Sequence, residues 1–382
     1  MRDIIRLFSD RESRDELGLG AIRDDVSDGL FPGTSTLLTR ARYLLFVPWV
    51  YQLAAGSDAP LDRANQLELR LIEALRAADD TSGLLGVRAG KELRTLPSQV
   101  YWSMLGRYGI LTDPSMTREG ALLAERTEEA GAWSGTLPEA PQNFPRAVTG
   151  GLQLSSEEAG WLRDRILAHA PDTAFAHLMV VPPEVDSRFI WADPVVEQLG
   201  GPAQLAVENA RAFSAVMHGA QLLYNLLLAT EYEAHGFDNL NDPADRYREE
   251  LSAWADRLPS ELDLATWQLD DFLAGLEYQR GRPYAFATRV FVRDWLALCR
   301  GTDPGQLATD ASARELIRRR ERHAKGSQAR LGNPRRLSNW GGGSGHSALA
   351  FRWGNARTIA RDIHAGLSAS QVDAELAEGR RA

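Results

Sequence analysis

The stretch from Pro202 to about His235 has the strongest helical pattern in the chain. Its apolar residues recur at helical spacing: Leu205, Val207, Ala210, Phe213, Met217, Ala220, Leu223 and Leu227. A helix that is apolar on much of its circumference, as residues 213–229 are, has to be covered by protein on several sides. The pattern therefore predicts a central buried helix, and Gly219 within it predicts close packing of a neighbouring helix.

Helical patterns also dominate the rest of the chain, so we predict a mainly α, multi-lobed helical protein with a few short strands. Ser155 and Glu158 form an S-x-x-E capping box ahead of an apolar stripe, which indicates a helix start. Short strands are expected near 175–191 or 348–353.

No apolar run approaches the roughly 18 residues of a membrane span, and the charged N-terminus lacks a signal core. We therefore expect a cytoplasmic location and no membrane partner.

Changes in composition along the chain predict five parts. A helical lobe over 1–130 precedes a linker or long loop over 131–150, which is rich in glycine and proline. A central helical lobe follows over 151–310. After it come a basic C-terminal segment over 311–367 and a disordered tail over 368–382.

The common catalytic signatures are missing from the sequence. There is no phosphate-binding G-x-x-x-x-G-K-[ST] loop, no H-E-x-x-H zinc motif and no G-x-S-x-G nucleophile elbow. The single cysteine, Cys299, excludes an internal disulfide and a cysteine-based zinc site. We therefore predict no catalytic residue, no metal site and no cofactor.

Charge is unevenly distributed along the chain. The net charge is -9, yet residues 314–361 contain twelve basic residues, eleven of them arginine, against only Glu315 and Glu321. A block of one sign attracts polyanions, and arginine suits bidentate phosphate contacts. Aromatic residues lie among the arginines, a combination typical of nucleic-acid surfaces. We predict that nucleic acid, DNA rather than RNA, contacts Arg318, Arg319, Arg322, Lys325, Arg330, Arg335, Arg336, Trp340 and Arg352.

Two other partners could neutralise the same arginines. The acidic remainder of the chain could bind its own basic segment, in which case the arginines pair within the protein. An acidic partner protein is the third alternative. Loss of folding stability on mutation, without any change in nucleic-acid affinity, would indicate the first of these two.

A smaller feature is the stretch FPGTSTLLTRAR over 31–42. Thr34 or Ser35 can cap a helix that Pro48 ends or kinks. Free backbone amides at such a helix start can bind an anion. The pattern thus predicts a phosphate or sulfate site, with a capped helix and two surface arginines as the alternative. The site would consist of Gly33, Thr34, Ser35, Arg40 and Arg42.

Four stretches together resemble one bacterial family. They are ELGLGAIRDDVSDGLFPGTSTLLTRARYLLFVPW (16–49), RAGKELRTLPSQVYWSMLGRYGI (88–110), FSAVMHGAQLLYNLLLATEYE (213–233) and LAFRWGNARTIARDIHAGL (349–367). Through them nearly the whole chain resembles domain-of-unknown-function family 6361. The resemblance implies a bacterial cytoplasmic protein encoded near helicases and phospholipase-D-like nucleases, in cassettes for defence against foreign DNA. It implies no catalytic residue.

Three classes of function remain open. The first is a non-catalytic, nucleic-acid-associated subunit of an anti-phage or genome-defence assembly, with helicase or nuclease subunits as partners. The second is a nuclease or nucleotide-acting effector enzyme with an unrecognised site, for which Asp24, Asp25 and Asp28 are candidate carboxylates. The third is a pure protein-interaction scaffold. The basic segment and the missing catalytic signatures favour the first.

Overall fold

The computed structural model describes residues 15–77, 81–87, 93, 95–127 and 131–379. Helices dominate this part of the chain, which confirms the mainly α prediction, and no strand occurs in it; the β-type pairing there is an isolated bridge between Leu111 and Trp133. The predicted short strands are therefore wrong. Residues 175–191 form a short helix and an irregular loop, because the Asp193 carboxylate accepts the Glu184 and Val185 amide protons, both at 3.2 Å.

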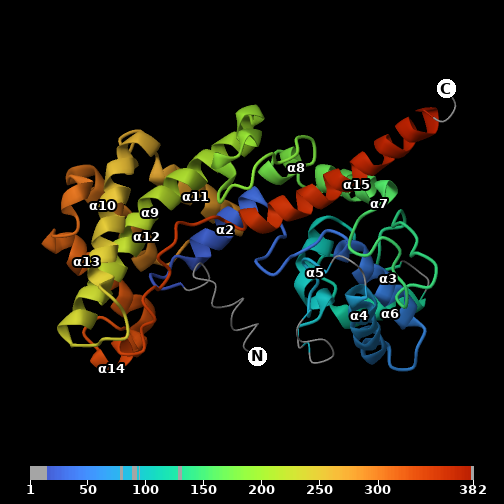
Figure 1. The fold of residues 1–382 in the computed structure, drawn as a ribbon, viewed down its shortest axis with the longest axis horizontal. Helices are drawn as coiled ribbons and strands as arrows, with labels where there is room; N and C mark the ends of the chain where they lie inside the picture. The colour runs from blue at the N-terminus through green and yellow to red at the C-terminus, as the bar shows by residue number, and fades with distance from the viewer. Residues whose placement is uncertain (1–14, 78–80, 88–92, 94, 128–130, 380–382) are drawn as a thin grey trace. The chain divides into compact units, whose positions relative to one another are not determined.

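The chain folds as two compact units, each assembled from two stretches of sequence (Figure 1). Unit 1 comprises residues 1–26 and 208–351, and unit 2 comprises residues 27–207 and 352–382. The predicted basic segment over 311–367 falls partly into each unit. Residues 1–14 of the predicted N-terminal lobe and 380–382 of the predicted tail lie outside the described residues.

Unit 2 is organised around α3 (Tyr43–Ala55), which is buried along most of its length. This helix packs against α4, α5 and α6, and α15 packs along α7. The capping box predicted at Ser155 is confirmed at the start of α7, where Ser155 Oγ accepts from the Glu158 amide at 3.2 Å. The other elements of unit 2 are α4 (Pro60–Arg76), α5 (Pro97–Arg107), α6 (Arg118–Thr127), α7 (Ser156–His169), α8 (Ala174–Leu178), η2 (Ile190–Ala192), η3 (Pro194–Gln198) and α15 (Trp353–Gly379).

Unit 1 is organised around α9 (Gly201–Ala234), which confirms the predicted central buried helix. Trp254 of α10 and Trp295 of α12 donate to the carbonyl oxygens of Ala215 and Val216, at 2.8 and 2.9 Å. Both borders between the units at 26 and 207 fall inside helices, α2 (Gly20–Leu30) and α9. The remaining elements are α10 (Pro243–Glu261), α11 (Leu269–Arg280), α12 (Phe286–Gly301), η4 (Pro304–Gln306), α13 (Ala311–Lys325), η5 (Gly326–Gln328) and α14 (Pro334–Leu337).

Helix α9 is also the described helix that is long and apolar enough to cross a membrane by length and composition. Its most apolar window is 94% buried by other parts of the protein. The apolar circumference of this helix is thus covered by its own chain, as the sequence pattern predicts.

Candidate nucleic-acid interface

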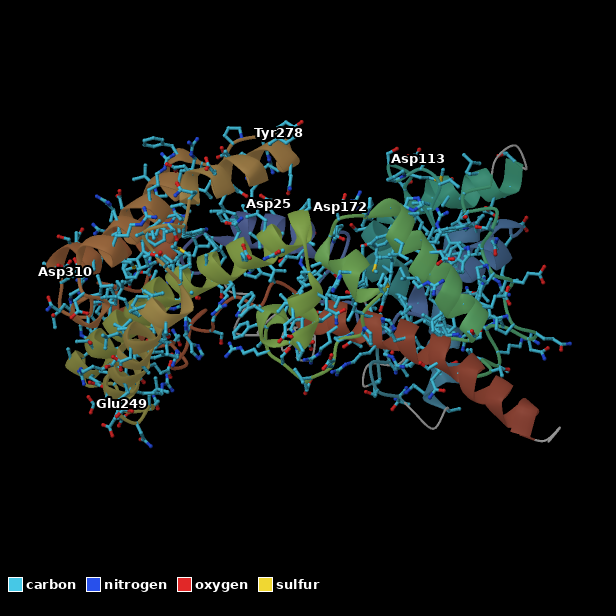
Figure 2. The ribbon with its side chains drawn as sticks, turned by 90° about the horizontal axis from the view of Figure 1, so that it is seen from above. Asp25, Asp113, Asp172, Glu249, Tyr278 and Asp310 are labelled. Carbon is cyan, nitrogen blue, oxygen red and sulfur yellow. The ribbon has the colours of Figure 1, made fainter. Side chains whose placement is uncertain are left out.

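Helix α13 carries most of the residues predicted to contact phosphate. It begins beside Asp310, labelled in Figure 2, whose carboxylate accepts the Ala313 amide proton at 2.7 Å. Its buried residues lie on one face, since residues three and four apart are neighbours on a helix. Arg318 and Arg322 lie on the opposite face. Arg320 is on the buried face, where it donates to the carbonyl oxygen of Leu17 at 2.6 Å and burial lowers its pKa.

Glu16 holds two of the predicted phosphate contacts inside unit 1. Its buried carboxylate accepts from Lys325 Nζ and from Arg330 Nη1, the latter at 3.0 Å. The side chains of Lys325 and Arg330 are only 17% and 18% exposed. These two cations therefore stabilise the fold, as the alternative of pairing within the protein predicts.

Glu231 joins α13 to the turn before α14. Its carboxylate accepts from Arg318 Nη2 at 3.4 Å and from the Gly332 amide at 2.8 Å. Through this one carboxylate, the exposed face of α13 and the chain leading to Arg335 lie side by side. Glu231 neutralises Arg318 in part, because the side chain of Arg318 is still 32% exposed.

Two further arginines of α13 make weak surface pairs. Arg319 lies 3.5 Å from Asp294 and Arg322 lies 3.5 Å from Glu315. Their side chains are 64% and 66% exposed. Ion pairs as exposed as these contribute little to stability, so both guanidinium groups stay accessible to a polyanion.

Within the described part of the basic segment, Arg335 and Arg336 are the two basic residues whose charge the fold does not use. Both lie on α14 and are exposed, and neither guanidinium group makes an ion pair or a hydrogen bond with the described residues. The Asn333 side chain caps this short helix by accepting the Arg336 amide proton at 3.3 Å. We call Arg318, Arg322, Arg335 and Arg336 together the α13–α14 patch.

The structure corrects the prediction for Trp340. Its ring is 3% exposed and packs against Tyr232 and Tyr247, so it offers no free face for a base.

Arg352, another predicted phosphate contact, is also bound within the protein. It belongs to unit 2, where its guanidinium donates to Asp28 and to the Thr34 carbonyl oxygen, both at 2.6 Å.

The prediction that a helix starts at Thr34 or Ser35, on which the anion site depends, is wrong. Helix α3 begins at Tyr43 and continues through Pro48. The proline lies inside the helix, where its missing N–H removes one intrahelical hydrogen bond without ending the helix. Residues 34–42 are irregular, and the Thr34 amide donates to the Phe31 carbonyl oxygen at 3.2 Å instead of facing solvent.

The two arginines of that predicted site are engaged as well. Arg40 Nε lies 2.9 Å from the Asp362 carboxylate, and Arg42 Nη2 lies 2.8 Å from Glu158. Arg42 also donates to the carbonyl oxygen of Gly151 at 2.8 Å. Gly33 and Ser35 therefore have neither a helix N-terminus nor free arginines beside them, and the basis for an anion site there is removed.

The carboxylates considered for an enzyme all have partners within the fold. Asp24 pairs with Arg23 at 3.1 Å, and Asp25 accepts the Tyr284 hydroxyl proton at 2.5 Å. Asp28 pairs with Arg352. The described residues contain no group of three or more potential metal ligands.

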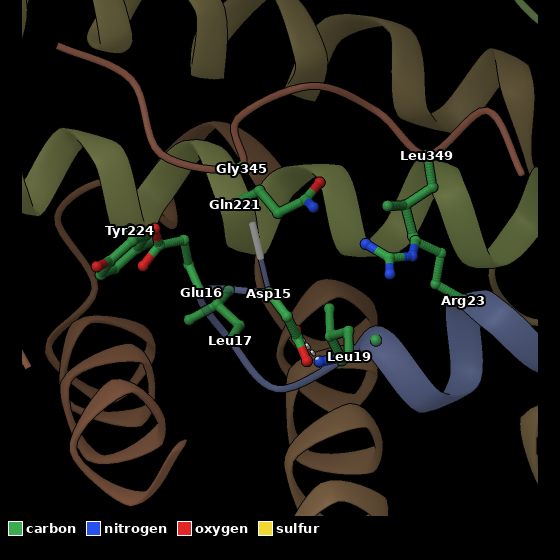
Figure 3. Close-up of a pocket in the computed structure, with 10 residues that line it drawn as sticks. Asp15, Glu16, Leu17, Leu19, Arg23, Gln221, Tyr224, Gly345 and Leu349 are labelled. Carbon is green, nitrogen blue, oxygen red and sulfur yellow. Dashed lines mark hydrogen bonds between the residues drawn. The ribbon is translucent and has the colours of Figure 1, made fainter. Parts of the chain in front are cut away.

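A small pocket lies in unit 1 between the chain that precedes α2, helix α9 and the loop before α15 (Figure 3). Its volume is about 20 Å³, which is room for about one water molecule. The polar groups in its wall include Asp15, which accepts the Leu19 amide proton at 2.5 Å, and Tyr224, which donates to Glu321 at 2.6 Å. The pocket is too small for a metabolite.

Nothing in the sequence singles out Glu16 and Glu231 as the partners of the basic segment. Each lies far from its arginines along the chain, at separations of 314 residues for Glu16 and Arg330 and 87 for Glu231 and Arg318. No local pattern marks such a partner. Only the acidic balance of the remainder of the chain indicates that partners of this kind exist.

The comparisons with known proteins concern the family alone. The model of DUF6361, a family of unknown function, matches residues 1–366. No curated protein and no solved structure matches the chain. Since the family model covers nearly the whole sequence, the chain belongs to DUF6361, a family of unknown function.

Proposed function

We propose that this protein is a non-catalytic, nucleic-acid-associated subunit that binds phosphates through the α13–α14 patch. The observation that carries the proposal is the exposure of Arg335 and Arg336 without an ion pair among the described residues. Two adjacent arginines without counter-charge favour a bidentate anionic ligand. Arg318 and Arg322 lie on the same patch, each opposed by one partly exposed glutamate.

The wider setting of this proposal rests on the family resemblance. From that resemblance we propose a role in a bacterial genome-defence assembly in the cytoplasm, with helicase or nuclease subunits as partners. Foreign DNA would then be the polyanion, which favours DNA over RNA. Phosphate contacts position a protein without reading bases, so the patch suits sequence-independent binding.

The proposal is narrower than the whole basic segment. Lys325 and Arg330 bind Glu16, and Arg352 binds Asp28, so these three residues have structural roles. Replacing them is expected to lower stability. Replacing Arg335 and Arg336 is expected to lower affinity and leave stability unchanged.

A charge-matched pair of variants tests the proposal. The test variant is Arg335→Ala/Arg336→Ala, and the control is Arg70→Ala/Arg76→Ala, which removes two exposed arginines of α4 in unit 2. Fluorescence anisotropy with labelled duplex and single-stranded oligonucleotides at low salt measures affinity, and thermal unfolding measures stability.

We expect the test variant to bind all sequences more weakly by a similar factor, with an unchanged melting temperature. The control variant should bind like the wild type. Absence of wild-type binding at low salt would refute the proposal, as would equal loss of affinity in both variants.

A further inference from the structure

Two aromatic side chains on either side of the turn between α11 and α12 are almost fully exposed. Tyr278, near the end of α11, is 89% exposed, and Phe286, the first residue of α12, is 81% exposed. Figure 2 labels Tyr278 at the end of its helix. Single exposed apolar residues are ordinary on protein surfaces. Two aromatic rings on neighbouring helix ends, separated by one short turn, form a shared feature that the fold does not use.

The turn between these rings is held firmly in place. Tyr284, between them, is 4% exposed, and its hydroxyl donates to the Asp25 carboxylate at 2.5 Å. Its amide donates to Glu277 at 2.8 Å, and the Arg280 guanidinium lies over its ring at 4.5 Å. Exposure of Tyr278 and Phe286 is therefore built into an anchored hairpin, and ordering them on a ligand costs little backbone entropy.

The hairpin also presents a cation without a counter-charge. Arg280 is paired with Asp25 at 3.2 Å, and Arg289 with Glu277 at 3.7 Å. Arg282, between Tyr278 and Phe286 in sequence, is exposed and makes no ion pair or side-chain hydrogen bond with the described residues. An exposed arginine that lies in sequence between two exposed aromatic residues supplies the kinds of group that bind an anionic ligand with flat apolar surfaces.

The hairpin is linked to the helix that carries part of the α13–α14 patch, because α12 packs against α13. Helices α12 and α13 run antiparallel, because Arg320 donates to Thr288 Oγ1 at 3.0 Å while Arg319 lies 3.5 Å from Asp294. The first turn of α12, with Phe286, is thus placed beside the C-terminal half of α13. Arg322 lies in that half.

We infer that Tyr278, Arg282 and Phe286 form a base-stacking site for single-stranded nucleic acid. The inference rests on the proposed function and specifies the form of nucleic acid that this site prefers. Unpaired bases stack on aromatic side chains whatever their sequence, because every base has a π face. In duplex DNA the base faces are stacked on one another, so the rings would gain nothing from it. These exposed rings can supply the aromatic contact with nucleic acid that the sequence predicts for Trp340, which is buried.

The test uses the full chain and a fluorescein-labelled oligothymidylate of about 15 nucleotides, a length within the usual site size for single strands. Three double variants are compared with the wild type: Tyr278→Ala/Phe286→Ala, Tyr278→Leu/Phe286→Leu and Tyr278→Trp/Phe286→Trp. A duplex of the same length and the Arg335→Ala/Arg336→Ala variant serve as references. Light scattering reports the oligomeric state of each variant.

We expect the alanine and leucine variants to bind oligothymidylate at least about tenfold more weakly, with duplex affinity unchanged. The tryptophan variant should retain single-strand affinity, because it keeps the stacking faces. The dependence of binding on salt should stay the same in all three, since stacking releases no counterions.

Several results would overturn the inference while leaving the proposed function intact. One is wild-type affinity for oligothymidylate in the alanine variant while Arg335→Ala/Arg336→Ala binds weakly. Another is retained affinity in the leucine variant, which would indicate an apolar contact without stacking. A changed oligomeric state with unchanged single-strand affinity would assign the rings to a protein contact. If the wild type binds neither oligonucleotide, the proposed function itself fails.

Discussion

Glu68 is fully buried in α4, where its carboxylate accepts from the Ser98 amide at 2.8 Å and the Ser98 hydroxyl at 2.7 Å. Burial raises its pKa from 4.5 to about 7, although these hydrogen bonds and the nearby Arg118 act in the opposite direction. In the unfolded chain this glutamate titrates near its ordinary value. The folded state therefore binds a proton that the unfolded state has released between about pH 4.5 and 7.

This difference predicts a stability that falls as pH rises. Because the pKa of Glu68 is higher in the folded state, its protonation stabilises the fold in full at pH values below the pKa of the unfolded chain. This contribution is lost as the pH rises through the pKa of the folded state. The free energy of unfolding of unit 2 should decrease between pH 5 and pH 8 by up to about 3 kcal/mol. Its melting temperature should fall over the same range. Glu68→Gln should flatten this pH dependence. The control Glu119→Gln, on the exposed side of α6, should leave the pH dependence unchanged. A wild-type profile that Glu68→Gln does not alter would contradict the assignment.

Glu16 gives a second prediction for a single residue. Glu16→Gln leaves Lys325 and Arg330 without their shared carboxylate, which is 6% exposed. Removing one partner of a buried ion pair costs several kcal/mol, and we expect about 1 to 3 kcal/mol because both cations are partly solvated. Chemical denaturation measures the loss. Glu315→Gln is the control, because its pair with Arg322 is exposed and should change stability by less than about 0.5 kcal/mol. Equal effects of both variants would argue against a structural role for Glu16.

Among the elements, the contact between α9 and α10 depends on Gly219. A methyl group at this position would overlap the ring of Trp254, whose indole nitrogen is fixed by its hydrogen bond to the Ala215 carbonyl oxygen at 2.8 Å. Gly219→Ala should destabilise unit 1 by about 1 to 3 kcal/mol, as overpacked cores do. Gly275→Ala in α11 meets no atom within 4 Å and should stabilise by roughly 0.5 to 1 kcal/mol through helix propensity. A neutral Gly219→Ala would refute the close packing.

The elements that the sequence predicts well are those encoded by local patterns. The apolar spacing of α9 and the capping box at Ser155 depend on neighbouring residues alone, and the structure confirms both. The predictions for the start of α3 and for a strand near 175–191 are wrong because groups outside those stretches decide the structure. Asp362 accepts the Ala41 amide proton at 2.8 Å, and Asp193 holds the loop at Glu184. No pattern within those stretches reveals either acid.

The sequence predicts the candidate site only in part, for the same physical reason. It predicts a cluster of arginines, because charge is read directly from composition. Which arginine is exposed depends on tertiary partners, so Lys325 and Arg335 look alike in sequence and differ in the fold. The sequence does not predict the exposure of Tyr278 either, because an aromatic residue in an amphipathic helix is usually expected in the core.

Across the whole molecule, the chain is acidic, yet its basic segment is only partly neutralised. In unit 1 the chain just before α2 binds this segment through Glu16, Leu17 and Gly18. The arginines left over are those of the α13–α14 patch and Arg319, whose surface pair with Asp294 is weak. A chain of net charge -9 repels polyanions overall, so binding has to depend on this local patch and on ionic strength.

The central claim is tested most directly by the salt dependence of binding to one duplex oligonucleotide. The logarithm of the association constant should fall linearly with the logarithm of salt concentration, by about 0.9 per phosphate contacted. Arg335→Ala/Arg336→Ala should reduce that slope by about 1.8, with an unchanged melting temperature, because two phosphate contacts are lost. An identical slope in the variant, or no wild-type binding even at low salt, would contradict the account.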